Sequence, residues 1–112
     1  MIVLKFGGSS VASATEVEQV LAVLAQQKKP MAVVVSALGG ITDELHALGK
    51  LAADGDASYA DRLKQVEERH VMMVQALIPV SKRSAILSAT KQIINKLETI
   101  LEGTFMIREL SP

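Results

Sequence analysis

The first ten residues constrain the fold more than any other stretch, because a short apolar run ends there in a lysine, two glycines and two hydroxyl side chains. The run over residues 2–6 predicts a buried β-strand, and Gly7, Gly8 and Ser9 then predict a tight turn into a helix. Backbone N–H groups at such a turn point toward an anion, and Lys5 adds a full positive charge. The alternative is an ordinary strand and turn whose lysine only keeps the strand end soluble.

A second apolar run, over residues 31–35, follows the first at a distance that fits one helix. Ser13 and Glu16 have the spacing of a capping box at the start of that helix, and Pro30 stops it. The apolar residues between them recur on one helical face: Val17, Val20, Leu21 and Leu24. Strand, helix and strand in this order predict two parallel strands with a right-handed crossover. The continuous apolarity of the second run indicates a sheet that is covered on both faces.

A second glycine loop follows the second strand and carries a hydroxyl at each end, at Ser36 and Thr42. Thr42 is expected to cap a further helix. The inner face of that helix is expected to carry Leu45, Leu48 and Ala52. The composition changes after Ala52, where two aspartates flank a glycine, so we expect the helix to end there.

Two longer amphipathic helices are predicted in the second half of the chain. The first begins near Ser58 and ends before Pro79, and the second begins at Ser81 or Ser84. Gly103 fits the position just past the end of the second helix. The buried face of this helix is expected to carry five residues spaced three and four apart: Ile86, Thr90, Ile93, Leu97 and Ile100.

The two glycine loops are predicted to share one edge of the sheet, because parallel strands have their carboxyl ends on the same side. Lys5 and Gly8 would then lie beside Ser36 and Thr42. Phosphoryl transfer needs this arrangement: a lysine and backbone amides neutralise the donor phosphates, and separate groups hold the acceptor in line. The loops therefore indicate a site that handles phosphate.

Composition excludes several classes of function. The 112 residues fit one small domain, and the 12 basic and 12 acidic residues balance, so neither a nucleic acid nor a membrane is expected as a partner. The chain has no cysteine, and no group of side chains has metal-ligand spacing, so no metal site is expected. Because no signal peptide or bilayer-spanning run is visible, a cytoplasmic location is favoured.

Two segments resemble the signature motifs of aspartate kinases, within the amino acid kinase family. Residues 5–12 read Lys-Phe-Gly-Gly-Ser-Ser-Val-Ala, and residues 33–43 read Val-Val-Val-Ser-Ala-Leu-Gly-Gly-Ile-Thr-Asp. Residues 108–112 are similar to the stretch that precedes the family's Gly-Glu motif. The resemblance implies that residues 1–112 are the N-terminal fragment of one catalytic domain, with no internal boundary. The implied fold is α/β, a three-layer αβα sandwich with about four helices and parallel strands over residues 2–6 and 31–35.

The activity that this resemblance implies is transfer of the γ-phosphate of ATP, with Mg²⁺, to the β-carboxylate of L-aspartate. That reaction is the first step toward lysine, threonine and methionine, and family members form homo-oligomers. By matching positions, Lys5 would be the catalytic cation and would bind ATP together with three loop residues: Gly7, Gly8 and Ser9. Ser36 and Thr42 would contact the aspartate. Some relatives carry regulatory domains or a fused homoserine dehydrogenase.

The residues present lack the Gly-Glu motif and the later segments that hold the nucleotide base, the metal and the acceptor carboxylate. The fragment by itself is therefore expected to be inactive. Asp43 departs from the asparagine of many relatives, and we interpret its carboxylate as favourable near a helix N-terminus. Two alternatives stay open: a related kinase with another acceptor (glutamate, acetylglutamate, carbamate or a nucleotide monophosphate), and a non-catalytic helical interaction module.

Overall fold

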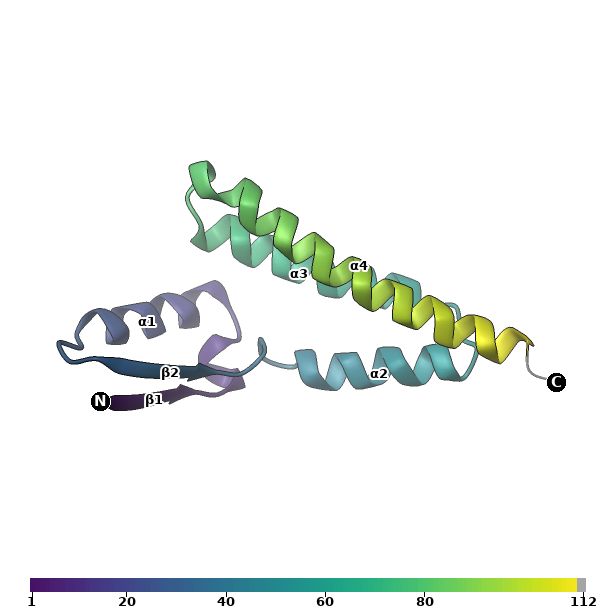
Figure 1. Ribbon diagram of the computed structural model, residues 1–112, viewed down its shortest axis with the longest axis horizontal. Coiled ribbons are helices and arrows are strands. Elements are labelled where there is room, and N and C mark those ends of the chain that lie inside the picture. Colours follow the sequence, from purple (N-terminus) through teal and green to yellow (C-terminus); the bar gives the residue numbers. More distant parts are fainter. Residues whose placement is uncertain (111–112) are drawn as a thin grey trace. The chain divides into compact units, whose positions relative to one another are not determined.

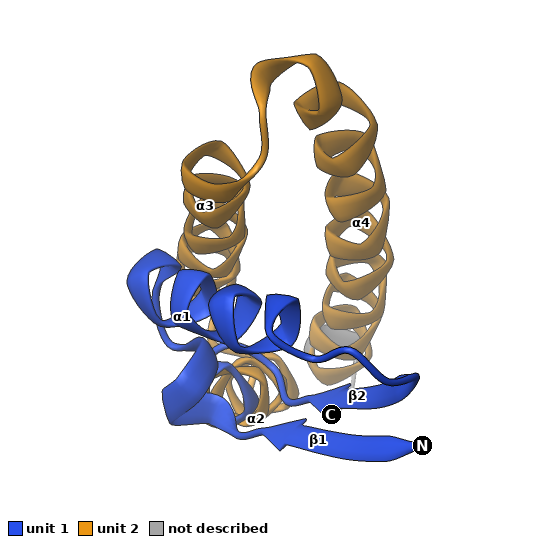
Figure 2. Cartoon of the chain, turned by 90° about the vertical axis from the view of Figure 1, so that its left-hand side faces the viewer, with its two compact units in different colours: residues 1–42 blue, residues 43–112 orange. Residues whose placement is uncertain are grey.

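The computed structural model describes residues 1–110 as an α/β protein with four α-helices and a two-stranded sheet (Figure 1). These residues form two compact units that divide between Thr42 and Asp43, and we call them the N-terminal unit and the helical unit (Figure 2). The motif similarity noted over residues 108–112 lies partly outside the described residues. Within the described part of the chain, no helix combines the length and the apolarity that a membrane span requires.

The N-terminal unit is built on two strands, β1 (Ile2–Phe6) and β2 (Met31–Val35). They pair in parallel, in a register that runs from Ile2 opposite Met31 to Phe6 opposite Val35. A short 3₁₀ helix, η1 (Gly8–Val11), and the helix α1 (Ala14–Ala25) connect them. The strand ranges and the parallel order that the apolar runs predicted are confirmed.

The start and the end of α1 differ from the prediction in detail. Ser13 is the N-cap residue, but its hydroxyl donates to the Glu16 carboxylate and makes no capping bond to a backbone amide. The bond from the Ser13 side chain that defines the predicted capping box is therefore not formed. At the other end, the amide of Gln26 donates to the carbonyl oxygen of Val23 at 3.2 Å, and α1 ends at Ala25, before Pro30 is reached.

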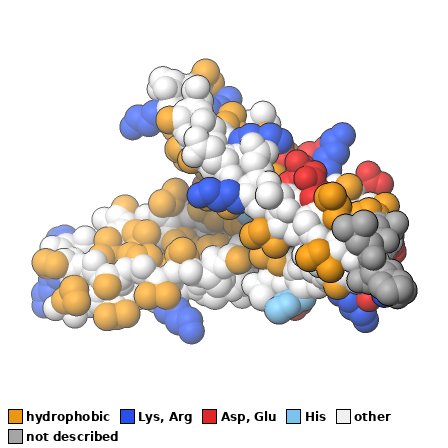
Figure 3. Space-filling view, turned by 45° about the vertical axis from the view of Figure 1, so that its right-hand side comes forward, with side chains coloured by type: hydrophobic (Ala, Val, Ile, Leu, Met, Phe, Trp, Pro, Cys, Tyr) orange, Lys and Arg blue, Asp and Glu red, His pale blue; other side chains and the backbone are white. Residues whose placement is uncertain are grey.

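Within the N-terminal unit, only one of the two faces of the sheet is covered, whereas the sequence predicted cover on both. Phe6 lines a pocket together with Val20 and Val23 of α1, so α1 lies over this face of the sheet. Val3 and Val34 belong to the other face and are 65% and 50% exposed. The unit contains one α-helix, and a single helix covers only one face of a sheet. Figure 3 shows hydrophobic side chains gathered on the surface of the molecule at the lower left.

The helical unit contains α2 (Ile41–Ala53, which begins two residues before the unit), α3 (Tyr59–Leu77) and α4 (Val80–Leu110). Two ion pairs tie its helices together. Arg62 of α3 makes two hydrogen bonds of 2.8 Å to the carboxylate of Glu44 in α2. Lys91 of α4 donates to Glu67 of α3 at 2.9 Å. The buried residues of this unit are Leu48, Ala52, Tyr59, Leu63, Val66, Ile94 and Leu101.

The two long helices form an antiparallel pair joined at Pro79 (Figure 1). The guanidinium of Arg83 donates to the carbonyl oxygens of Ile78 at 2.8 Å and Gln75 at 2.7 Å. Carbonyls at the end of a helix lack partners within the helix, so this arginine satisfies the C-terminal end of α3. The sequence prediction of a break before Pro79 is confirmed, although α4 begins at Val80 rather than at a serine.

Three predictions about α2 and α4 are wrong. Thr42 does not cap α2, because the helix already begins at Ile41, directly after Gly40, whose φ is +81°. Leu45 is 40% exposed instead of lying on the inner face. Gly103 does not end α4, which continues to Leu110. A glycine costs a helix only about 1 kcal/mol.

The residues beyond Gly103 show why the helix continues. The ring of Phe105 packs against that of Tyr59 in α3, with ring centroids 5.5 Å apart. An aromatic pair of this kind contributes about 0.5–1.5 kcal/mol beyond burial, which is comparable to the cost of the glycine. Tertiary packing therefore holds the last turns of α4 in helical form.

The buried face of α4 matches the predicted one only in part: Thr90 and Leu97 are partly buried as expected, but the isoleucines of that face are exposed. Ile93 and Ile100 are 67% and 65% exposed, whereas Ile94 and Leu101 are buried. One residue along a helix turns the side chain by about 100°. Apolar residues recur at helical spacing on two adjacent faces of α4. The periodicity of the sequence therefore did not show which of these faces is buried.

Candidate functional site

The two glycine loops meet at the carboxyl end of the sheet. The amide of Ser36 donates to the carbonyl oxygen of Phe6 at 3.1 Å, which extends the pairing of the strands by one residue. Beyond that bond, Gly8 of the first loop lies against Gly39 of the second. A Cβ atom built on Gly8 would be 3.7 Å from the Cα of Gly39 and 3.7 Å from the Ser36 hydroxyl. The predicted proximity of the loops is confirmed.

The two loops approach each other most closely at Gly39. A Cβ atom at this position would lie 3.0 Å from the carbonyl oxygen of Gly8 and 3.0 Å from the Cβ of Ala12. Real Cβ atoms seldom have neighbours this near. A glycine at position 39 therefore lets the two loops pack this closely without a shift of either one.

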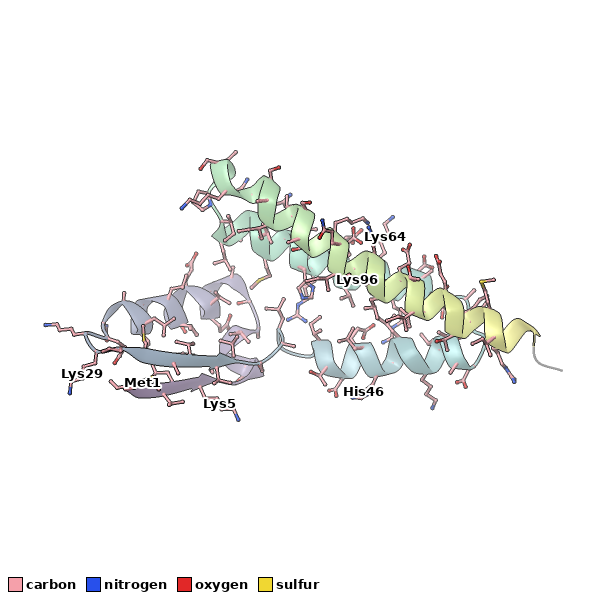
Figure 4. The ribbon with its side chains drawn as sticks, in the orientation of Figure 1. Met1, Lys5, Lys29, His46, Lys64 and Lys96 are labelled. Atoms are coloured by element: carbon pink, nitrogen blue, oxygen red, sulfur yellow. The ribbon has the colours of Figure 1, made fainter. Side chains whose placement is uncertain are left out.

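Lys5 lies one residue before the end of β1, opposite Val34 of β2. Its side chain is exposed and points away from α1 (Figure 4). Side chains alternate between the faces of a sheet, so Lys5, Val34 and the next alternate residue, Ser36, belong to one face. No hydrogen bond or ion pair within residues 1–110 engages the Lys5 ammonium group, so a full positive charge is available at this edge.

The remaining predicted site residues, Gly7, Ser9 and Thr42, lie in three different local structures. Gly7 is extended (φ −79°, ψ 179°) and precedes η1, while Ser9 lies within η1. The helix that follows this loop is thus a 3₁₀ turn of four residues, and α1 begins only at Ala14. Thr42 is exposed in the first turn of α2, and no hydrogen bond of the described residues joins its side chain to Ser36.

The hydroxyl of Ser36 donates to the carbonyl oxygen of Ala37 at 2.9 Å. This is a local bond on an exposed residue, so an incoming polar group can replace it at small cost. The structure therefore brings Gly8 next to Ser36, and it places Lys5 on the same sheet face as Ser36. Thr42 follows six residues after Ser36 in the chain.

A pocket of about 290 Å³ lies on the α1 side of the sheet. Both apolar and polar side chains line it: Phe6, Ser9, Ser10, Glu16, Gln19, Val20 and Val23. Of the predicted site residues, Ser9 alone contributes to it. Sequence reasoning did not identify this pocket, although the helical face of α1 and the paired serines were its available signals.

The chemistry of the donor groups suits an anion better than a metal ion. The loops offer a lysine, backbone amides and hydroxyls, which bind phosphate oxygens. Among the described residues, no three His, Cys, Asp or Glu side chains gather in a way that could hold a metal. The groups whose pKa departs from its ordinary value, Asp56, Tyr59 and Lys91, all belong to the helical unit.

Comparison with known proteins places this geometry in context. The model of the amino acid kinase family matches residues 1–104. Aspartokinase 1, chloroplastic, from Arabidopsis thaliana is 34% identical over 113 residues, which cover 97% of this chain and 19% of that protein. The aspartokinase of Chlamydia trachomatis serovar D is 34% identical over 76 residues, covering 68% of this chain and 17% of that protein.

The name of a third relative gives two enzyme activities. Bifunctional aspartokinase/homoserine dehydrogenase 1, chloroplastic, from Arabidopsis thaliana is 30% identical over 103 residues, covering 91% of this chain and 11% of that protein. The chain therefore spans less than a fifth of the length of the curated relatives that it matches.

Proposed function

The chain belongs to the amino acid kinase family, and on that premise we propose that it is the N-terminal part of an aspartate kinase. The proposed reaction transfers the γ-phosphate of ATP to the β-carboxylate of L-aspartate. The observation that carries the proposal is the contact of Gly8 with Ser36 and Gly39, at the sheet edge where Lys5 lies. Relatives named aspartokinase support aspartate as the acceptor.

In the proposed mechanism, a carboxylate oxygen of aspartate attacks the γ-phosphorus as the bond to the bridging oxygen of ADP breaks. Negative charge accumulates on the transferring group and on the leaving oxygen. The ammonium group of Lys5 neutralises part of this charge, and the backbone of Gly7, Gly8 and Ser9 lines the phosphates. Mg²⁺ would neutralise further charge when it is bound with ATP.

Ser36 and Thr42 are proposed to hold the aspartate in line with the donor. Ser36 stands 3.7 Å from the position of a Cβ on Gly8, so a substrate at its hydroxyl would be next to the phosphate loop. A hydroxyl contributes orientation without a second charge that would have to be desolvated. For Thr42 the support is its place in the matching motif and its exposure.

We further propose that residues 1–112 lie within one catalytic domain of the three-layer αβα type, in a homo-oligomeric cytoplasmic enzyme. The sheet of the N-terminal unit, with two strands and one uncovered face, supports the larger domain, because two strands do not make a stable sheet on their own. The fragment alone is proposed to be inactive, since no residues in it are assigned to hold the nucleotide base.

The test is the substitution Lys5→Ala in the full-length protein that contains this segment. Loss of a charge that meets the transition state should lower kcat by about 10²–10³-fold, by analogy with removal of one preorganised donor. Aspartate-dependent release of ADP is the measurement. Lys29→Ala is the matched control. Lys29 is also exposed, but it precedes β2 and so lies at the opposite end of the strands from the glycine loops (Figure 4).

Full activity of the Lys5→Ala protein would remove Lys5 from the mechanism. An acceptor screen on the unmodified protein tests the substrate. Turnover with glutamate, acetylglutamate, carbamate or a nucleotide monophosphate, and none with aspartate, would replace the proposed acceptor while keeping the kinase chemistry.

A further inference from the structure

We propose that Gly39 is a positioning residue, which sets the separation between the phosphate loop and the acceptor loop. The inference rests on the proposed function for its kinetic consequence, while its structural basis is independent of that function. Gly39 itself contacts no substrate in this proposal. It acts through the backbone of Gly8 and through Ala12.

The three atoms nearest to a Cβ built on Gly39 are the Cβ of Ala12 at 3.0 Å, the carbonyl oxygen of Gly8 at 3.0 Å and the Cα of Ala12 at 3.3 Å. None of them belongs to the far end of a flexible side chain. A methyl group at this position can be accommodated only if the backbone of one loop moves by a few tenths of an ångström.

Comparison with the neighbouring Gly40 shows that the two positions favour glycine for different reasons. Gly40 has a φ of +81° and nothing within 4 Å of a Cβ, so its need for glycine is conformational. Gly39 has no positive φ, so its need for glycine is one of space. The two adjacent glycines therefore have different roles. Gly40 allows the chain to turn, and Gly39 leaves room for the first glycine loop.

The contact is also asymmetric between the two loops. A Cβ on Gly8 would meet its neighbours at 3.7 Å, which is ordinary van der Waals contact, whereas a Cβ on Gly39 would meet them at 3.0 Å. Gly39, rather than Gly8, therefore limits how closely the two loops can approach each other. In-line transfer depends steeply on this separation, since a misplacement of about 1 Å can cost about 10²-fold in rate.

The kinetic test compares Gly39→Ala with the unmodified full-length protein. Each loop keeps its own contacts with its substrate, so the KM values for ATP and aspartate should change by less than about threefold. The value of kcat should fall by about tenfold or more, because donor and acceptor are held too far apart. Gly49→Ala is the matched control: it adds the same methyl group where no atom lies within 4 Å, and it should leave kcat unchanged.

A second variant separates positioning from folding. Ala12→Gly removes one of the two atoms at 3.0 Å, so the double variant Ala12→Gly/Gly39→Ala should recover part of the lost kcat. A purely structural role would lower the melting temperature and leave kcat of the folded protein unchanged. An unchanged kcat in Gly39→Ala, or a double variant as slow as the single one, would overturn the proposal.

Crystal structures of the unmodified protein and of Gly39→Ala supply a readout that does not depend on activity. The distance between the Gly8 carbonyl oxygen and the Cα of residue 39 should increase by a few tenths of an ångström. If the unmodified protein shows no aspartate-dependent turnover, the proposed function fails, and this distance still decides whether Gly39 sets the spacing. An unchanged distance would refute the positioning role.

Discussion

The N-terminal unit and the helical unit divide chemistry and packing between them. The N-terminal unit carries Lys5 and both glycine loops, yet Val3 and Val34 of its sheet are at least half exposed. The helical unit carries the Arg62–Glu44 and Lys91–Glu67 ion pairs and a set of buried residues along all three of its helices. Groups that are proposed to act on a substrate are therefore displayed on the less buried of the two regions.

The difference has a physical reason. A helix buries its apolar stripe against one or two other helices, and α2, α3 and α4 supply one another with such surfaces. A parallel sheet needs cover on both faces and at both edges, which a unit with a single α-helix does not supply. The helical unit should thus be the more stable region, and three predictions test that contrast.

The largest effect is expected from Leu63→Ala in α3. Leu63 is 3% exposed, so its truncation leaves a cavity and should lower the free energy of unfolding by about 2–5 kcal/mol. Val34→Ala in β2, at a position that is 50% exposed, should change it by less than about 0.5 kcal/mol. Urea unfolding of the 112-residue chain, followed by circular dichroism, measures both. Equal effects of the two substitutions would contradict the contrast between the units.

A smaller effect is expected from Ser36→Ala, measured as steady-state kinetics of the full-length protein. Loss of a hydrogen bond of ordinary strength, about 0.5–1.5 kcal/mol, should raise the KM for aspartate up to about tenfold and leave the KM for ATP unchanged. Thr42→Ala should act in the same direction. Because both hydroxyls are exposed, neither substitution should alter stability. Equal changes in the two KM values would count against an acceptor role.

The smallest effect concerns alkaline pH and the helical unit alone. Burial of Tyr59, together with the nearby carboxylates of Glu102 and Glu98, raises the pKa of its phenol above the usual 10.0. The hydrogen bond to Glu67 raises the pKa of Lys91 above the usual 10.5. In both cases the folded state favours the protonated form, so stability is complete below the unfolded-state pKa and is lost as the pH rises through the folded-state value.

Urea midpoints measured between about pH 9 and 12 should therefore fall with increasing pH. The double variant Tyr59→Phe/Lys91→Met should show a shallower fall, because neither group can then titrate. A pH profile that is identical in the double variant would show that these two groups do not control alkaline stability.

The sequence alone determined what short-range signals encode. Two short, mostly apolar runs defined the strands, and Pro79 separated the long helices. The order of the elements required parallel pairing, which brought the two glycine loops to one edge. The family followed from motifs in those loops. Each of these features depends on local conformational preference or on the order of elements along the chain.

Tertiary structure decided the features that depend on what lies opposite a residue. Ile94 is buried and Ile93 is exposed because α3 packs on one of two apolar phases of α4. The helix passes through Gly103 because Phe105 meets Tyr59 beyond it. Gly39 favours a glycine because the other loop lies 3.0 Å from where its Cβ would be. A sequence states which side chains are available, but only packing fixes the distances between residues far apart in the chain.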